Sequence, residues 1–183
     1  MVETLEKGKT GTSLLNASDR SGKFLTFSLG EEGYGIEILK VQEIIGLMKI
    51  TRIPRIPHYI CGVINLRGKV IPVIDLRKRF EMTDIVDSDR NCIIVVNVSR
   101  EGTILTIGLL VDQVAEVLDL GSEQIEPPPS FGNSVETKFI FGVGKVEEKV
   151  LMLLEVDDIL SADEISQATT LTHSSEAKNT DQE

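Results

Sequence analysis

Short apolar runs that alternate with polar residues dominate the middle of the chain. The segment KFLTFSL (23–29) alternates, and a turn at EEGY leads into YGIEI (34–38). Similar runs follow at GVINL (62–66), KVIPVIDL (69–76), CIIVVNV (92–98) and TILTIGLLV (103–111). Period-two alternation bounded by Gly turns predicts β-strands, and many short strands in succession favour small β-barrels.

Helical patterns are few and short. LRKRF (76–80) is one candidate, and SEQI (122–125), followed closely by PPP, is a second. A third is VDDIL with SADEI (156–165), in which Ser161 and Glu164 have the spacing of a capping box. The pattern therefore predicts a mainly β protein with a few short helices.

The two ends of the chain lack this periodicity. Residues 1–21 are predicted to be a flexible tail, and residues 162–183 a mostly disordered acidic tail that can begin with a short helix. The segment 22–161 is predicted to be the folded domain. We expect a first barrel at roughly 22–85 and a second at roughly 86–161, and the boundary leaves room for an exchange of strands.

An internal repeat supports two similar half-domains. YGIEILKVQEIIGL (34–47) aligns with IGLLVDQVAEVLDL (107–120), so that Gly35 matches Gly108 and Glu43 matches Glu116. GVINLRGKVIPVIDL (62–76) likewise resembles GVGKVEEKVLMLLEV (142–156). Chance similarity among Val, Ile and Leu strands is the alternative, but it does not explain the shared Gly, Glu and Lys positions. Barrels this small bury little surface alone, so we expect them to pack on one another.

The turn of the first-half hairpin carries an arginine. It reads Leu66-Arg67-Gly68-Lys69, whereas the matching turn of the second half holds Glu147-Glu148. Gly68 can adopt a positive φ, so a tight turn fits there. Because the same corner accepts either sign of charge, folding does not demand Arg67, and we predict a surface role for it.

Charge is distributed unevenly. The chain has 19 basic and 29 acidic residues and a net charge of −10, which argues against nucleic-acid binding. The window 49–79 is nonetheless basic, with Asp75 as its one acid. Its cations are Lys49, Arg52, Arg55, Arg67, Lys69, Arg77, Lys78 and Arg79. Such a region steers an acidic partner, and a solvated face without a partner is the alternative.

The sequence carries no recognisable catalytic or metal-binding pattern. Two His and two Cys, placed as they are, supply no zinc ligand set. GVGK (142–145) lacks the first Gly and the Ser or Thr of a phosphate loop. We therefore expect no enzyme activity, metal or cofactor. Without a signal-peptide pattern or a run of about 20 apolar residues, the chain is expected to be cytoplasmic.

Several of these segments resemble the CheW family of bacterial chemotaxis coupling proteins. The resemblance rests on FLTFSLGEEGYGIEILKVQEIIG, GVINLRGKVIPVIDLRKRF, LVDQVAEVL and QIEPPPSF, and it runs from about Phe24 to Leu160. It implies two SH3-like five-stranded β-barrels packed side by side. It also implies a non-catalytic adaptor that joins methyl-accepting chemoreceptors to the regulatory domain of the histidine kinase CheA. Such an adaptor would be recruited to membrane-associated receptor arrays without inserting into the membrane.

The resemblance also implies site residues. Those implied in receptor binding are Val41, Glu43, Ile44, Gly62, Arg67, Val114 and Val117, and Phe131 is implied in kinase binding. For the four aliphatic residues the alternative is core packing, and for Phe131 it is a buried plug. Relatives often carry a basic residue at the position of Glu126 and an acidic one at that of Ser130, so this chain departs from the charge pattern of the kinase contact.

Other functions are alternatives to the adaptor. The same fold serves as a module of CheV-type proteins and as a kinase regulatory domain, which are the related alternatives. A small ligand-binding barrel is the alternative of a different class.

Overall fold

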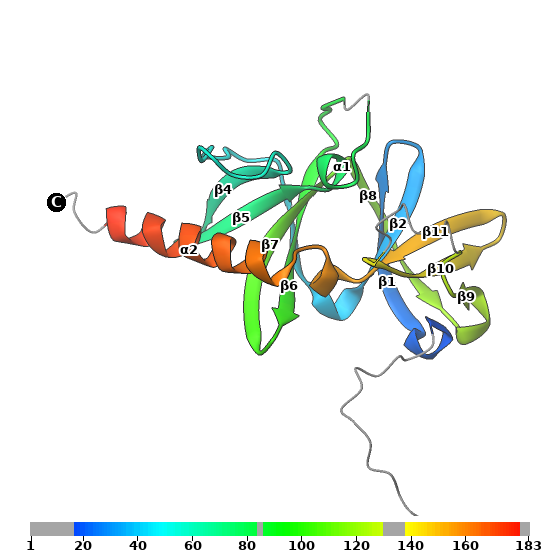
Figure 1. The fold of residues 1–183 in the computed structure, drawn as a ribbon. Coiled ribbons are helices and arrows are strands. Elements are labelled where there is room, and N and C mark those ends of the chain that lie inside the picture. The colour runs from blue at the N-terminus through cyan, green and yellow to red at the C-terminus, as the bar shows by residue number, and fades with distance from the viewer. Residues whose placement is uncertain (1–16, 84–85, 130–137, 180–183) are drawn as a thin grey trace, which may run out of the picture.

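The computed structural model describes residues 17–83, 86–129 and 138–179 and is mainly β (Figure 1). The strands of the described residues are β1 (Gly22–Leu29), β2 (Glu32–Glu37), β3 (Val41–Gly46), β4 (Ile60–Leu66), β5 (Lys69–Asp75), β6 (Cys92–Arg100), β7 (Thr103–Val111), β8 (Gln113–Leu120), β9 (Ile125–Glu126), β10 (Ile140–Val146) and β11 (Lys149–Leu154). The helices are α1 (Leu76–Arg79) and α2 (Ala162–Asn179), with short 3₁₀ turns η1 (Ala17–Arg20), η2 (Ile38–Lys40), η3 (Ser122–Gln124) and η4 (Val156–Asp158). The predicted strands and short helices are thus present.

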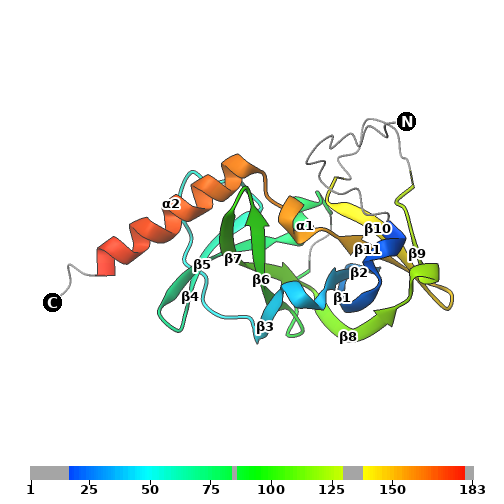
Figure 2. The same cartoon turned by 90° about the horizontal axis from the view of Figure 1, so that it is seen from below.

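The strands form two sheets that exchange strands between the halves of the chain. One sheet has the order β8-β1-β2-β11-β10-β9 and the other β3-β6-β7-β5-β4. The expected division into 22–85 and 86–161 differs from this arrangement, because β1 and β2 join the sheet of the second half while β6 and β7 join that of the first. The two units lie side by side in Figures 1 and 2.

This exchange follows the internal repeat residue by residue. β5 pairs in parallel with β7, placing Val73 opposite Gly108, and β11 pairs in parallel with β2, placing Leu153 opposite Gly35. The sequence repeat equates β2 with β7 and β5 with β11, so the two pairings are the same pairing made twice. The small Gly is required here, since a Cβ on Gly108 would lie 2.7 Å from Ile93 Cγ2.

Each sheet closes on itself at equivalent points. In the first, Thr51 and Val63 exchange backbone hydrogen bonds of 2.8 and 2.9 Å, which tie the segment after β3 to β4. In the second, β9 pairs with β10 so that Glu126 lies opposite Val143, the repeat partner of Val63. These contacts close each sheet into the SH3-like form, while β3 and β8 remain edge strands.

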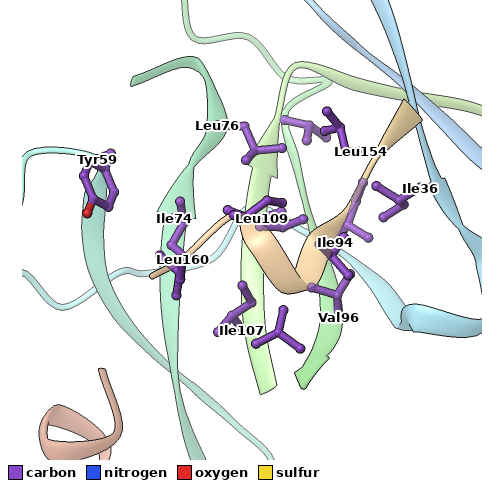
Figure 3. Packing of buried hydrophobic residues seen from close by; sticks show 14 of the residues in the cluster. Ile36, Tyr59, Ile74, Leu76, Ile94, Val96, Ile107, Leu109, Leu154 and Leu160 are labelled. Carbon is purple, nitrogen blue, oxygen red and sulfur yellow. The ribbon is translucent and has the colours of Figure 1, made fainter. Parts of the chain in front are cut away.

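Three apolar clusters hold the molecule together. One fills the first unit around Ile64, Val73 and Val95, and a second fills the other unit around Phe24 and Leu153. The largest cluster lies between the sheets, where Ile36 and Leu154 face Ile74, Ile94 and Leu109 (Figure 3). A fully buried aliphatic side chain of this size stabilises by about 1.5–3 kcal/mol. The two units therefore fold as one body.

The C-terminal helix is longer than the short helix that the sequence suggests. α2 begins at a capping box in which Ser161 N donates to Glu164 Oε2 (2.6 Å) and Glu164 N donates to Ser161 Oγ (3.2 Å). Its residues Ile165 and Ala168 are buried in the central cluster, and the helix runs beside β5 (Figure 1). Tertiary burial, rather than the polar composition of this segment, stabilises its first turns.

Candidate protein-binding site

Strand β3 carries three of the predicted site residues. Its pairing with β6 shifts register between Val41 and Glu43, so that Gln42 forms a bulge. Val41 is half-buried against the central cluster, whereas Ile44 remains 45% exposed. The bulge therefore directs Val41 inward and leaves Ile44 as an apolar surface residue on the edge of the sheet.

Arg67 and Glu43 form a two-pronged ion pair. Arg67 Nη1 donates to Glu43 Oε1 at 2.6 Å, and Arg67 Nη2 donates to Glu43 Oε2 at 2.8 Å. The Arg67 side chain is 72% exposed and that of Glu43 21%. The hydrogen bond from Arg67, followed by its charge, lowers the pKa of Glu43 below its usual range. Because β3 and β4 are the two edges of the five-stranded sheet, the pair spans the closure of the first unit.

The β4–β5 turn presents the Arg67 side chain to solvent. Arg67 has φ 52° and Gly68 φ 85°, the left-handed conformations of a tight hairpin turn. Asn65 Oδ1 accepts a 2.9 Å hydrogen bond from Gly68 N, which fixes the turn. Glu147 has φ 55° at the matching corner of the second half. Either side chain is thus accommodated, as the sequence predicts.

Gly62 differs from the other predicted site residues because it is buried. It has φ 144°, and a Cβ built there would lie 2.1 Å from the Thr51 carbonyl oxygen. The residue also sits at the register shift between Ile60 and Gly62 in the β4–β5 pairing. Its local role is to let the segment after β3 close onto β4, and it contributes to any surface through that closure.

The second half contributes Val114 and Val117 from β8. Val114 is half-buried against the same central cluster as Val41, and Val117 is 48% exposed. These two pairs occupy equivalent positions of the repeat, on the edge strand of each sheet. The structure thus places Ile44 and Val117 as exposed apolar residues and Val41 and Val114 as their partly buried supports.

Two further exposed leucines flank β3. Leu39, in η2, is 95% exposed, and Leu47, directly after β3, is 52% exposed. The sequence pattern indicates neither leucine, because each lies among apolar residues of the kind that form a core. For Leu39, the sequence signal is the interruption of the alternating pattern at Ile38–Lys40. The structure explains this interruption, because these residues form the 3₁₀ turn η2.

Phe131 and Ser130 lie outside the described residues. The described segment before them, Pro127–Pro129, lines a mostly apolar pocket of about 330 Å³ together with Val150 and Met152. Glu126 pairs with Lys145 at 2.7 Å at its rim. An apolar hollow therefore adjoins the point where the chain enters the segment that contains Phe131.

The basic window of the sequence divides in the structure. Arg77 is 3% exposed and is bonded to Asp75, Asp87 and Asp112 at 3.0–3.2 Å. Burial lowers its pKa, but the hydrogen bond and charge of Asp75 outweigh that effect and raise the pKa of Arg77 overall. Arg79 is half-buried and donates to the Ile159 carbonyl at 2.9 Å. These two arginines are structural, so the prediction of a surface basic region holds only for the remaining cations.

Groups with potential for catalysis are few. No cluster of three or more His, Cys, Asp or Glu residues able to hold a metal ion occurs in residues 17–83, 86–129 and 138–179. Cys61 and Cys92 are free, partly buried thiols, and burial raises the pKa of Cys61 to about 11. A thiol with a raised pKa is a poor nucleophile at neutral pH. The described part of the chain also contains no helix long and apolar enough to span a membrane.

Comparison with known proteins agrees with the geometry. The family model for the CheW-like domain matches residues 23–164. The chain belongs to the CheW family. Chemotaxis protein CheW of Klebsiella aerogenes is 41% identical over 144 residues, which are 79% of this chain and 84% of that protein. Chemotaxis protein CheW of Bacillus subtilis is 33% identical over 138 residues, covering 75% of this chain and 86% of that protein.

The fold is also similar to that of a solved structure. The crystal structure of scaffolding protein TtCheW from Thermoanaerobacter tengcongensis has a TM-score of 0.70 and 38% identity, and the match covers 78% of this chain and 94% of that one. Chemotaxis protein CheV3 of Helicobacter pylori is 31% identical over 129 residues, which make up only 40% of its length. The CheW family membership expected from the sequence is therefore confirmed.

Proposed function

We propose that this chain is a non-catalytic chemotaxis adaptor that couples methyl-accepting chemoreceptors to a CheA-type histidine kinase. Membership of a family whose members are named chemotaxis and scaffolding proteins supports the adaptor role. The alternative that this chain is a module of a CheV-type protein is less well supported, because the match covers 40% of CheV3 but 84% of Klebsiella aerogenes CheW. On this proposal the protein works in the cytoplasm and is recruited to receptor arrays at the membrane.

The observations that carry the receptor contact are the exposed Arg67–Glu43 ion pair and the exposed apolar Ile44, which follows Glu43 on the edge strand β3. An ion pair of fixed geometry next to an apolar side chain can orient a partner and gain affinity by burying that side chain. Val117 on β8 offers the equivalent apolar contact from the other sheet. A helical receptor tip with apolar residues on one face and polar residues at its rim matches these features.

The kinase contact is proposed at Phe131, which follows in sequence the segment Pro127–Pro129 that lines an apolar pocket with Val150 and Met152. Val150 is 58% exposed, so this pocket offers apolar surface that a partner can bury. Glu126 stands at the position where relatives often carry a basic residue, and it pairs with Lys145 at 2.7 Å. The charge pattern of this contact therefore differs in this chain.

A reconstitution assay tests the function. Purified protein is mixed with a receptor cytoplasmic fragment and a CheA-type kinase, and co-sedimentation and autophosphorylation are measured. We expect the three proteins to sediment together and kinase activity to depend on this chain. Ile44→Asp should abolish receptor binding but keep kinase binding, and Phe131→Ser should do the reverse. Absence of binding to both partners by the folded wild-type chain would refute the proposal.

A further inference from the structure

A second hollow lies at the other end of the first unit from Arg67. It has a volume of about 560 Å³, within the range of ligand and peptide sites. Ile60 and Cys61 at the start of β4 and Asp75 at the end of β5 line it. Arg67 lies in the turn that joins the far ends of these two strands. The cavity is therefore distinct from the proposed receptor contact.

The wall of this cavity is apolar where the chain leaves β3. Leu47, Met48, Ile50, Ile53 and Ile56 contribute to it. Met48 and Ile50 also pack on the core of the first unit, and Ile56 packs on the central cluster. Ile53 belongs to none of these clusters and is partly exposed, and Leu47 is 52% exposed. The cavity thus offers apolar surface that folding itself does not use.

Cations without partners surround this wall. Arg52, in the loop between β3 and β4, and Lys78, in α1, line the cavity and are exposed. Arg55 is exposed on the same loop as Arg52. None of the three forms an ion pair with any described residue. The acids that line the cavity, Asp75 and Asp87, are both bonded to Arg77. Because Arg77 can offset only one of these two carboxylates, the lining holds three cations and two acids, and a protein of net charge −10 is net positive by one charge at this opening.

The loop that carries Arg52 and Arg55 is restrained by prolines and backbone hydrogen bonds. Pro54 and Pro57 restrict the backbone on either side of Arg55, which has φ 61°. The loop is tied down by the Thr51–Val63 hydrogen bonds at one end and by Ile60 N donating to the Pro57 carbonyl (3.0 Å) at the other. Preorganisation of this kind lowers the entropy lost when a partner binds.

From these features we infer that the cavity is a docking site for an acidic linear segment of a partner protein with one large apolar side chain. The apolar side chain enters between Ile53 and Leu47, and flanking Asp or Glu residues meet Arg52 and Lys78. Complementary charge would accelerate and orient the encounter, and the apolar contact would hold the complex. We take the occupant to be an acidic segment of a separate protein, and a second copy of this chain is an outcome that the test distinguishes.

Selection from a random-peptide display library on the full-length folded chain tests this inference. We expect enrichment of peptides that combine Asp and Glu with a Leu, Ile or aromatic residue, followed by measurement of each Kd by fluorescence anisotropy. Arg52→Glu combined with Lys78→Glu should weaken binding by about tenfold or more, and added salt should weaken it in the wild type. Ile53→Ser should also weaken it while leaving the circular dichroism unchanged.

The matched control is Lys23→Glu combined with Lys149→Glu, which changes net charge equally at exposed sites away from the cavity. Equal weakening by this control would show that net charge alone is responsible and would overturn the site. Failure to enrich acidic peptides, or full binding by Ile53→Ser, would also overturn it. Self-association of the wild type that Arg52→Glu with Lys78→Glu abolishes would identify a second copy as the occupant and likewise overturn the inference. The peptide-binding measurements use neither receptor nor kinase, so their outcome does not depend on the proposed coupling function. Each variant is also tested separately in the kinase assay.

Discussion

At the scale of single residues, the site combines exposed and buried groups that sequence patterns do not separate. Arg67 and Ile44 are surface residues, while Val41 and Val114 support them from the edge of the central cluster. Gly62 is buried and acts through backbone conformation. Substitutions of these residues should therefore separate into those that change binding and those that change folding.

The Arg67–Glu43 pair should matter for binding and little for stability. Arg67→Glu is expected to leave the urea-unfolding midpoint nearly unchanged, because the pair is exposed and screened. It should weaken binding of a receptor fragment by about tenfold or more through repulsion between Glu43 and the new carboxylate.

The charge-swapped double variant Glu43→Arg with Arg67→Glu separates two explanations. Recovery of binding would show that the pair positions the surface, whereas continued loss would show that the partner contacts the Arg67 guanidinium itself. Normal binding by the single variant would remove Arg67 from the site.

Gly62 should behave in the opposite way. Gly62→Ala is expected to destabilise the fold by more than about 2 kcal/mol, since it strains a positive φ and forces Thr51 away from Val63. Gly46→Ala is the control, because no atom lies within 4 Å of a Cβ at that position. Urea denaturation measures both, and equal stability of the two variants would contradict the closure role.

At the scale of elements, α1 and the loops beside it are held by one buried cation. Asp75 ends β5 and accepts from Arg77 N at 3.0 Å, which starts α1. The Arg77 side chain then reaches Asp87, before β6, and Asp112, between β7 and β8. One residue thus fixes three chain segments at the end of the first unit.

Loss of that cation should be costly. Arg77→Met is expected to destabilise the protein by about 3–5 kcal/mol, because it leaves Asp75 buried without its ion partner. Arg55→Met, which removes an exposed arginine, should change the free energy of unfolding by less than about 0.5 kcal/mol. Chemical denaturation followed by circular dichroism would compare them, and similar stability would contradict the structural role of Arg77.

At the scale of the whole molecule, the exchange of strands makes the two units interdependent. In the sheet order of the first unit, β6 and β7 lie between β3 and β5, and in that of the second, β1 and β2 lie between β8 and β11. Each half of the chain therefore lacks the central strands of its own sheet. The central cluster also draws side chains from both sheets.

The halves should consequently fold only together. The fragment 22–85 is expected to lack a cooperative thermal transition, because β3 has no neighbour without β6. Fragments 1–89 and 90–183 should recover the circular dichroism of the full chain when mixed, since together they supply both sheets. A cooperative transition of fragment 22–85 alone would contradict this account.

The sequence by itself determined the class of fold, the duplication, the family and the turn that carries Arg67. Alternation and Gly turns are local patterns, and the repeat compares two segments of the chain. All three can be recognised without knowing which strands are neighbours in a sheet. Only the tertiary structure decided that β2 pairs with β11 and β7 with β5, because a repeat equates strands without stating whose partner each takes.

The sequence likewise did not show which charged side chains are buried. Arg77 and Lys78 are adjacent cations, yet one is enclosed by three carboxylates and the other lies exposed at the rim of a cavity. The physical reason is that solvation depends on groups brought together from distant parts of the chain, such as Asp112 against Arg77. Composition and spacing along the chain record no such contacts.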